Sequence, residues 1–133
     1  MLRKVGAVIL LVSDIDRSID FYQNVLGLEL KSRSKEWTEF IKNGTVLALH
    51  PTKFKDLRRE GVLVGFKTSN LNDVYKKLKS KNVKFVKELT EEDFGKHMII
   101  TDPDGYMISI VEMKVGEKEE LKQAPGYYGF APV

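Results

Sequence analysis

The chain has 133 residues, carries 22 Lys and Arg against 19 Asp and Glu for a net charge of +3, and contains no cysteine. This length suits a single domain with a sizeable core, and the lack of cysteine excludes disulfides, thiolate chemistry and zinc–thiolate sites. The basic residues are scattered and no apolar run reaches the roughly 20 residues of a membrane helix, so we expect a cytoplasmic protein that binds neither nucleic acid nor membranes.

The first half of the chain predicts a strand, a helix and three further strands. Residues 5–12 form an apolar run rich in β-branched side chains, which is typical of a strand buried on both faces. Asp14 is a suitable N-cap for a helix whose apolar residues recur at helical spacing as far as Leu26, and Gly27 can supply the left-handed residue that ends it. The expected strands that follow span residues 28–33, 36–41 and 45–50. Asn43-Gly44 predicts a tight turn before the last of them.

A short basic segment, residues 51–60, connects the two halves of the chain. Its cations are Lys53, Lys55, Arg58 and Arg59. Charged residues around a proline are more often a solvated link than an anion-binding site, and we interpret the segment as a link.

The second half of the chain repeats the pattern of the first. We expect a strand at 61–68, a helix over 71–78 capped by Ser69 or Asn70, a left-handed Asn82 and a strand at 83–88. An acidic loop is expected at residues 91–95. After it, the segment 98–112 holds two apolar runs on either side of Asp102-Pro103-Asp104-Gly105, which predicts a β-hairpin with a defined turn.

The two halves form an internal repeat that can be aligned by residue number. An offset of 56 places Val12-Ser13-Asp14-Ile15 on Thr68-Ser69-Asn70-Leu71, and an offset of 61 places Asn43-Gly44 on Asp104-Gly105. Each half therefore has the order β-α-β-β-β. The tail, residues 114–133, is irregular and aromatic; it could be disordered, or could cover a groove or a neighbouring subunit.

Two motifs within this repeat resemble the vicinal oxygen chelate superfamily, which includes glyoxalase I, bleomycin-resistance proteins and extradiol dioxygenases. They are V-S-D-I-D-R-S-I-D-F-Y-Q-N-V-L-G-L-E-L at 12–30 and T-D-P-D-G-Y-M-I-S-I at 101–110. The resemblance implies an α+β fold of two tandem βαβββ modules whose curved mixed sheets surround a cavity. Within one domain, 1–133, the modules would span 5–50 and 61–113, with the linker 51–60 between them and the tail 114–133 after them.

The resemblance also implies where a metal ion would bind in metal-dependent members, namely at the positions occupied here by Ala7, Ala48, Leu63 and Ser109. Those members use His, Gln or Glu, whereas Ala and Leu have no donor atom and a neutral Ser hydroxyl is a poor ligand. We therefore expect no metal and no cofactor. The relevant similarity is to metal-free members that bind small molecules, such as bleomycin-resistance proteins.

Strand alternation predicts which side chains line the cavity. If the four metal positions face inward, so do Val5, Ile9, Leu11, Val46, Gly65 and Val111. Three-residue turns would add Thr38, Phe40, His97 and Ile99, whereas a two-residue turn would bring Trp37 and Glu39 inward in the first half. The candidate ligand-binding residues are Ala7, Thr38, Phe40, Ala48, His50, Leu63, Lys67, His97, Met107 and Ser109. Their small members favour a pocket over the alternative, a cavity filled by its own side chains.

His50 is the best candidate for a catalytic residue, because imidazole titrates near neutral pH and Glu36 could orient it. The alternative is a half-exposed histidine with no role in chemistry, and an atypical metal site of His50, His97 and Glu36 is a third possibility.

The expected function is metal-free binding of a small, mostly apolar or aromatic molecule, for sequestration or transport. One alternative is an enzyme of the same superfamily, a lyase, isomerase, transferase or dioxygenase-like protein, that uses His50 or an atypical metal site. Another is a structural or regulatory partner with a vestigial cavity. We expect a homodimer, because in relatives the halves of two chains combine and the tail residues Tyr127, Tyr128 and Phe130 offer an apolar surface.

Overall fold

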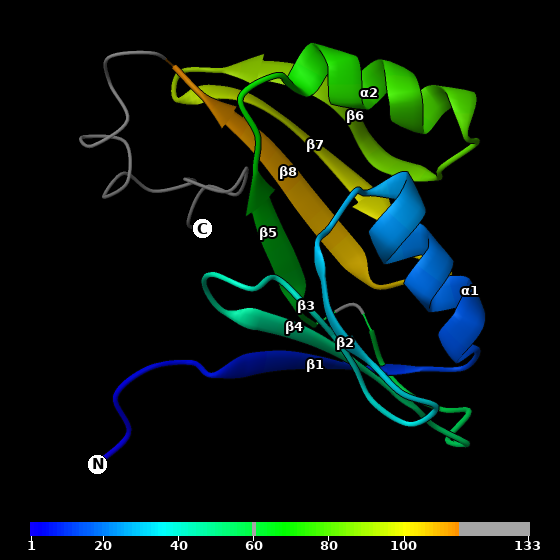
Figure 1. The fold of residues 1–133 in the computed structure, drawn as a ribbon. Helices are drawn as coiled ribbons and strands as arrows, with labels where there is room; N and C mark the ends of the chain where they lie inside the picture. The colour runs from blue at the N-terminus through cyan, green and yellow to red at the C-terminus, as the bar shows by residue number, and fades with distance from the viewer. Residues whose placement is uncertain (60, 115–133) are drawn as a thin grey trace. The chain divides into compact units, whose positions relative to one another are not determined.

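The computed structural model describes residues 1–59 and 61–114, which divide into two compact units (Figure 1). Unit 1 spans Met1–Leu57 and unit 2 begins at Arg58. Each unit holds one four-stranded mixed sheet and a helix that packs on it, which confirms the predicted α+β class. The predicted aromatic tail lies outside the described residues, apart from Lys114.

Unit 1 has the predicted order of elements. They are β1 (Ala7–Val12), α1 (Ile15–Asp20), the π-helical turn η1 (Phe21–Val25), β2 (Leu30–Arg33), β3 (Thr38–Phe40) and β4 (Val46–Pro51). The strand order in sheet one is β1-β4-β3-β2. β1 and β4 run parallel, and the other pairs are antiparallel.

The helix of unit 1 begins and ends at the predicted residues but changes its winding on the way. The Asp14 carboxylate accepts the Arg17 N–H at 3.1 Å, as an N-cap does, and Gly27 has a φ of +75°. Between them the chain widens into a π-turn, in which the Leu26 N–H donates to the Phe21 carbonyl. A periodicity near 3.6 cannot distinguish this turn from a regular helix end.

Strand β3 corrects one of the predicted faces. Thr38 pairs with Leu49, Glu39 with Ala48 and Phe40 with Leu47, so Glu39 shares a face with Ala48. Thr38 and Phe40 lie on the opposite face, and the Phe40 ring lies 6.1 Å from the Tyr22 ring of η1. The expectation that Thr38 and Phe40 line the cavity is therefore wrong.

The connection between β3 and β4 explains the change of face. It is not the assumed three-residue turn but spans residues 41–45, with Ile41 at a φ of +75° and Gly44 at +127°. An isoleucine rarely adopts positive φ, so turn residues alone did not predict it.

Unit 2 follows the same order. Its elements are β5 (Leu63–Lys67), α2 (Leu71–Ser80), β6 (Phe85–Glu92), β7 (Gly95–Thr101) and β8 (Met107–Met113), with strand order β5-β8-β7-β6 in sheet two. Asn70 caps α2 by accepting the Asp73 N–H at 3.3 Å, and Asn82 has the predicted left-handed φ, +58°. Gly105 has a φ of +92° in the predicted hairpin turn.

Strand β6 is longer than predicted. Residues 91 and 92 continue the strand instead of forming an acidic loop, and the hairpin turns at Asp93 and Phe94. Gly95, with a φ of +146°, opens β7 so close to the Glu112 carbonyl that a Cβ atom there would collide with it. The acidic run misled the prediction, because charged side chains are easily solvated on an edge strand.

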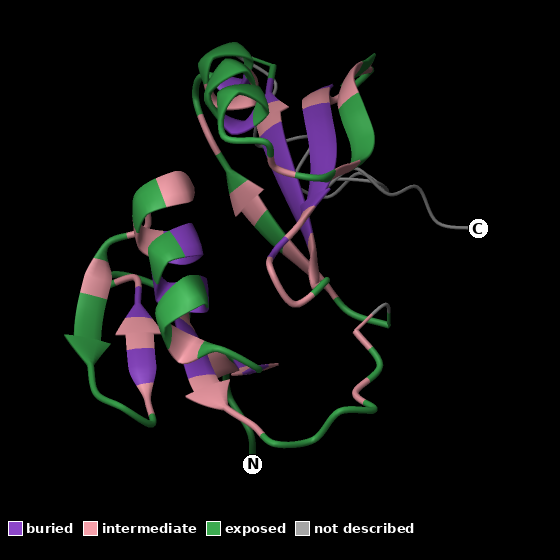
Figure 2. Ribbon diagram, turned by 90° about the vertical axis from the view of Figure 1, so that its right-hand side faces the viewer, coloured by how far each residue is buried: buried purple, intermediate pink, exposed green. Residues whose placement is uncertain are grey.

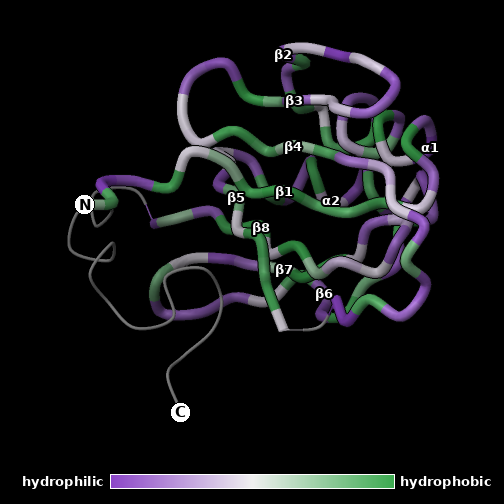
Figure 3. Tube along the Cα trace, turned by 90° about the horizontal axis from the view of Figure 1, so that it is seen from below, coloured by the Kyte–Doolittle hydropathy of each residue, from purple (hydrophilic) through white to green (hydrophobic). Residues whose placement is uncertain are grey.

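One face of each sheet forms the core with its helix. In sheet one this face carries Leu10, Val12, Phe40, Leu47 and Leu49, and in sheet two Met98, Ile100, Ile108 and Ile110, all of them buried. Figure 2 shows the buried residues on the central strands and on the helix sides toward them. Figure 3 shows the strongest hydrophobic colour along β1, β4, β7 and β8. Leu10, Leu47, Leu49, Ile108 and Ile110 thus lie on the helix-facing sides, as strand alternation requires when Ala48 and Ser109 lie on the opposite ones.

Candidate functional site

The face of each sheet that its helix does not cover is called here the helix-free face, and strand pairing defines its residues. In sheet one they are Ala7, Ile9, Leu11, Trp37, Glu39, Val46, Ala48 and His50. In sheet two they are Leu63, Gly65, Lys67, His97, Ile99, Met107, Ser109 and Val111. The pair Ile9–Ala48 corresponds to Gly65–Ser109 at the offsets that the repeat predicts.

Apart from Thr38 and Phe40, the candidate ligand-binding residues lie on these faces. Sheet one holds Ala7, Ala48 and His50; sheet two holds Leu63, Lys67, His97, Met107 and Ser109. The side chains differ in exposure: Ala48, His97 and Ser109 are fully buried, whereas the others are half-buried or exposed. Trp37 and Glu39 of β3 also lie on the helix-free face of sheet one. Successive residues of a strand point to opposite faces, and Thr38 and Phe40 point to the other face.

His50, at the end of β4, is oriented by main chain rather than by a carboxylate. Its Nδ1 lies 2.6 Å from the main-chain oxygen of Glu36. A carbonyl oxygen only accepts, so Nδ1 donates its proton and Nε2 is the acceptor nitrogen. The Trp37 ring lies 6.0 Å away. We predicted that the Glu36 side chain orients His50, whereas in the structure the Glu36 main-chain carbonyl does so. This contact also leaves Nε2 able to take a proton.

The other polar groups on the helix-free face of sheet one are bonded to each other. The Trp37 Nε1–H donates to Glu39 Oε2 at 2.6 Å, and Lys31 Nζ lies 3.6 Å from Glu39 Oε1. Both carboxylate oxygens of Glu39 are therefore engaged, which suits a positioning role for Glu39.

His97 is the most constrained polar group on the helix-free face of sheet two. Its Nε2 lies 3.2 Å from Glu92 Oε1, and the Phe94 ring lies 5.6 Å from the imidazole. Its Nδ1 is buried and has no hydrogen-bond partner in the described part of the chain. Sequence reasoning selected His97 but missed Glu92, because the expected strand ended at residue 88. The signal that would have identified Glu92 was the continuation of strand alternation beyond residue 88.

The positions of the family's metal ligands were tested against the side chains that occupy them. Ala7, Ala48, Leu63 and Ser109 offer no imidazole, carboxylate or amide, so these residues do not fit a divalent ion. Among residues 1–59 and 61–114, no three His, Asp or Glu side chains cluster closely enough to hold a metal.

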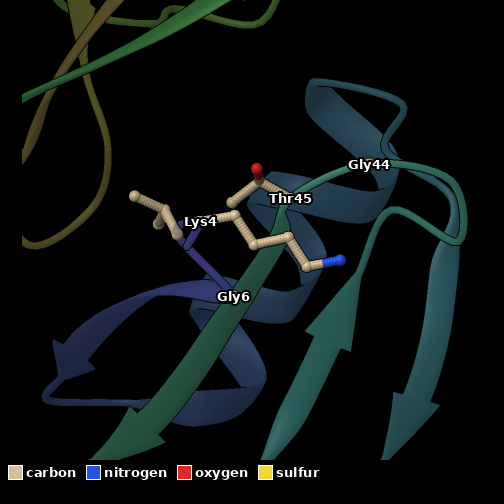
Figure 4. Close-up of a pocket in the computed structure, with 5 residues that line it drawn as sticks. Lys4, Gly6, Gly44 and Thr45 are labelled. Carbon is tan, nitrogen blue, oxygen red and sulfur yellow. The ribbon is translucent and has the colours of Figure 1, made fainter. Parts of the chain in front are cut away.

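Two hollows occur in unit 1, both at its solvated ends. One, of about 380 Å³, is lined by Lys4, Val5, Gly6, Gly44 and Thr45, all exposed (Figure 4). The other, of about 490 Å³, lies beside the ion pair of Arg33 and Asp16, whose atoms are 3.2 Å apart. Neither contains a buried polar side chain. Within the described part of the chain, no helix is long and apolar enough to cross a membrane.

Comparison with known proteins agrees with this architecture. Residues 4–110 match the model of the Glyoxalase/Bleomycin resistance protein/Dioxygenase superfamily. A lactoylglutathione lyase of Neisseria meningitidis is 30% identical over 122 residues, 80% of this chain and 88% of that protein. The metallothiol transferase FosB of Staphylococcus saprophyticus is 29% identical over 118 residues, 83% of this chain and 77% of that protein.

A solved structure shares the fold at lower identity. TnmS3, an antibiotic binding protein from Streptomyces sp. CB03234, superposes with a TM-score of 0.69 and 18% identity, over 85% of this chain and 98% of that one. The family match covers most of the chain, including both of the motifs first noted in the sequence. The chain therefore belongs to the Glyoxalase/Bleomycin resistance protein/Dioxygenase superfamily.

Proposed function

We propose that this protein binds a small, largely apolar or aromatic molecule without a metal ion, and that it acts by sequestration or transport. The observation that carries the proposal is the composition of the two helix-free faces. They combine apolar side chains with a few polar groups, and they lack donors at the family's metal positions.

The apolar part of these faces is partly accessible. Ile9 is 51% exposed, and Leu11, Val46, Leu63 and Met107 are half-buried. Apolar area removed from water stabilises a complex by about 25 cal/mol per Å², so a ligand that covers such side chains on either one of the two faces gains affinity without ionic contacts. Binding sites for small molecules commonly pair such surfaces with a few placed polar groups.

Retained ligand provides the direct test. Native mass spectrometry of gently purified protein should show a mass beyond that of the polypeptide, which denaturation releases as an organic molecule. The released molecule should then rebind saturably to the stripped protein and be recovered unchanged after incubation. The proposal would be contradicted if the native mass equals that of the polypeptide alone and the protein binds no member of a broad panel of apolar and aromatic compounds.

The second candidate is an enzyme, and the orientation of His50 favours it. Its Nδ1–H is held by the Glu36 carbonyl, which leaves Nε2 free to take a proton in a reaction. Two relatives are named as enzymes, the lactoylglutathione lyase and the metallothiol transferase. We expect neither activity here, because the metal positions lack donors. Turnover in either assay that disappears in His50→Ala would establish the enzyme instead.

We also propose that the protein is a cytoplasmic homodimer. β1 lies at the edge of sheet one, and the exposed Val5 and Ile9 give that edge an apolar surface. Sedimentation at tens of micromolar should show twice the chain mass. A monomer under those conditions would contradict the dimer and leave the binding proposal standing.

A further inference from the structure

The imidazole of His97 combines complete burial with an unused nitrogen. Its side chain has no exposed surface, Nε2 contacts Glu92 Oε1 at 3.2 Å, and Nδ1 has no partner among residues 1–59 and 61–114. Buried polar atoms in folded proteins nearly always have a hydrogen-bond partner, because an unmade bond leaves the desolvation cost uncompensated. An exception on a helix-free face suggests that a ligand supplies the missing partner.

The bond to Glu92 decides what kind of partner Nδ1 needs. A carboxylate only accepts hydrogen bonds, so Nε2 carries the proton and donates it. Lys87 Nζ lies 3.7 Å from the same carboxylate oxygen. In the neutral ring, Nδ1 is then a lone-pair acceptor. Its partner must be a donor.

Among the described residues, the sheet neighbours of His97 do not provide that donor. Its cross-strand neighbour on β6, Thr90, donates its hydroxyl to the main-chain oxygen of Glu88 at 2.8 Å. The neighbour on β8 is Val111, the next residue of β7 on this face is Ile99, and the Phe94 ring lies 5.6 Å away. A bridging water needs two to four polar partners, which these apolar side chains do not offer.

We propose that the ligand is a hydroxy-aromatic molecule, a phenol, whose O–H donates to Nδ1 of His97. This inference rests on the proposed function and narrows its ligand class. The aromatic ring matches the apolar side chains around the imidazole, and the phenolic hydroxyl is a strong donor that leaves no charge to bury. Glu92 is a positioning residue, because it holds the ring in the tautomer that accepts.

Two probes of the same shape test the proposal. 2-Naphthol carries the O–H donor, and 2-methoxynaphthalene lacks it. Their dissociation constants are measured by probe fluorescence on the full chain. One buried hydrogen bond predicts roughly tenfold tighter binding of the naphthol. In His97→Leu, which removes both imidazole nitrogens and leaves no acceptor in their place, the two probes should bind equally.

The outcomes separate this inference from the proposed function. Equal binding of both probes by the native chain overturns the phenol inference, while saturable binding itself supports the proposed function. A naphthol preference that survives in His97→Leu also overturns it, because another group must then receive the hydroxyl. If neither probe binds, the inference fails for naphthyl ligands, while rebinding of a retained ligand of another class would still support the proposed function.

Nuclear magnetic resonance of the imidazole nitrogens gives a readout that does not depend on a variant of His97. The chain has only two histidines, so His50→Gln assigns both rings by elimination. In the free protein, Nδ1 of His97 should be the unprotonated nitrogen and Nε2 the protonated one. 2-Naphthol should shift the His97 Nδ1 resonance and the ether should not. The opposite tautomer, or a His97 ring that does not respond to the naphthol, overturns the inference.

Discussion

The carboxylate of Glu112 reaches from β8 to the first residue of α2, where its Oε1 accepts the Leu71 N–H at 2.7 Å. The first N–H groups of a helix have no partner within the helix, and a negative charge there also suits the helix dipole. Asn70 accepts the Asp73 N–H in the same turn. A side chain from β8 and the N-cap residue thus each accept a hydrogen bond from an N–H group in the first turn of α2.

Glu112→Ala should lower the free energy of unfolding by about 1–2 kcal/mol, because it removes a charge-assisted hydrogen bond at a helix start. Denaturation by urea, followed by circular dichroism, measures the change. Glu91→Ala, which removes an exposed carboxylate from β6, is the matched control and should change stability by less than about 0.5 kcal/mol. Equal effects of the two substitutions would show that the contact with Leu71 contributes nothing.

The cluster of Glu88, Tyr75 and Lys79 should make stability depend on pH. Glu88 Oε1 lies 2.6 Å from both Tyr75 Oη and Lys79 Nζ. Hydrogen bonds from Lys79 and then Tyr75 lower the pKa of the Glu88 carboxyl. The hydrogen bond to Glu88 in turn raises the pKa of Tyr75 and that of Lys79.

The signs of these shifts define the pH range of the effect. A lowered carboxyl pKa contributes stability above its unfolded value, about pH 4, and the contribution is lost as pH falls through the folded value. The raised values of Tyr75 and Lys79 contribute below about pH 10 and are lost as pH rises through their folded values. Glu88→Gln should therefore lower the melting temperature slightly at pH 7, with a difference that shrinks at both extremes. Since the cluster is exposed, the effect is small. A difference that is constant from pH 3 to pH 11 would contradict the linkage.

Ile9 and Ala48 are directly paired on the helix-free face of sheet one but differ in exposure. Ala48→Trp should destabilise the protein by about 1–3 kcal/mol or more, because the ring has no space in a fully buried position. Ile9→Trp should leave stability within about 0.5 kcal/mol of the native value, because Ile9 is 51% exposed. Thermal unfolding of the two variants compares them directly. Similar destabilisation by both would show that Ile9 is covered in solution.

Removal of divalent metal should leave the protein unchanged. A metal ion that binds the native state would stabilise it by about 4 kcal/mol when the free metal concentration is a thousand times the dissociation constant. We expect elemental analysis to find no stoichiometric metal and EDTA to leave the melting temperature where it was, because Ala7, Ala48 and Leu63 have no donor atom and the neutral hydroxyl of Ser109 is a poor ligand. One equivalent of metal whose removal lowers the melting temperature would refute the metal-free proposal.

The sequence by itself determined the order of the elements, their caps and the register of the repeat. These features depend on local signals: a carboxylate at Asp14 before a helix, an amide at Asn70, left-handed conformations at Gly27 and Asn82, and a turn ending at Gly105. Because the two halves repeat at constant offsets, the central parallel pairs could also be aligned without a structure. The faces of the strands in these parallel pairs followed from alternation, whereas the face of β3 did not.

Only the tertiary structure decided the features that depend on how one segment meets another. The face of Phe40 depended on the conformation of Ile41, which no turn preference predicts, and on the ring of Tyr22 against which it packs. The partner of His97 depended on β6 continuing to Glu92, because cross-strand pairing outweighed the solvation of an acidic run. Only three dimensions show that Nδ1 of His97 is buried without a hydrogen-bond partner among the described residues, since the side chains that surround it are distant in the sequence.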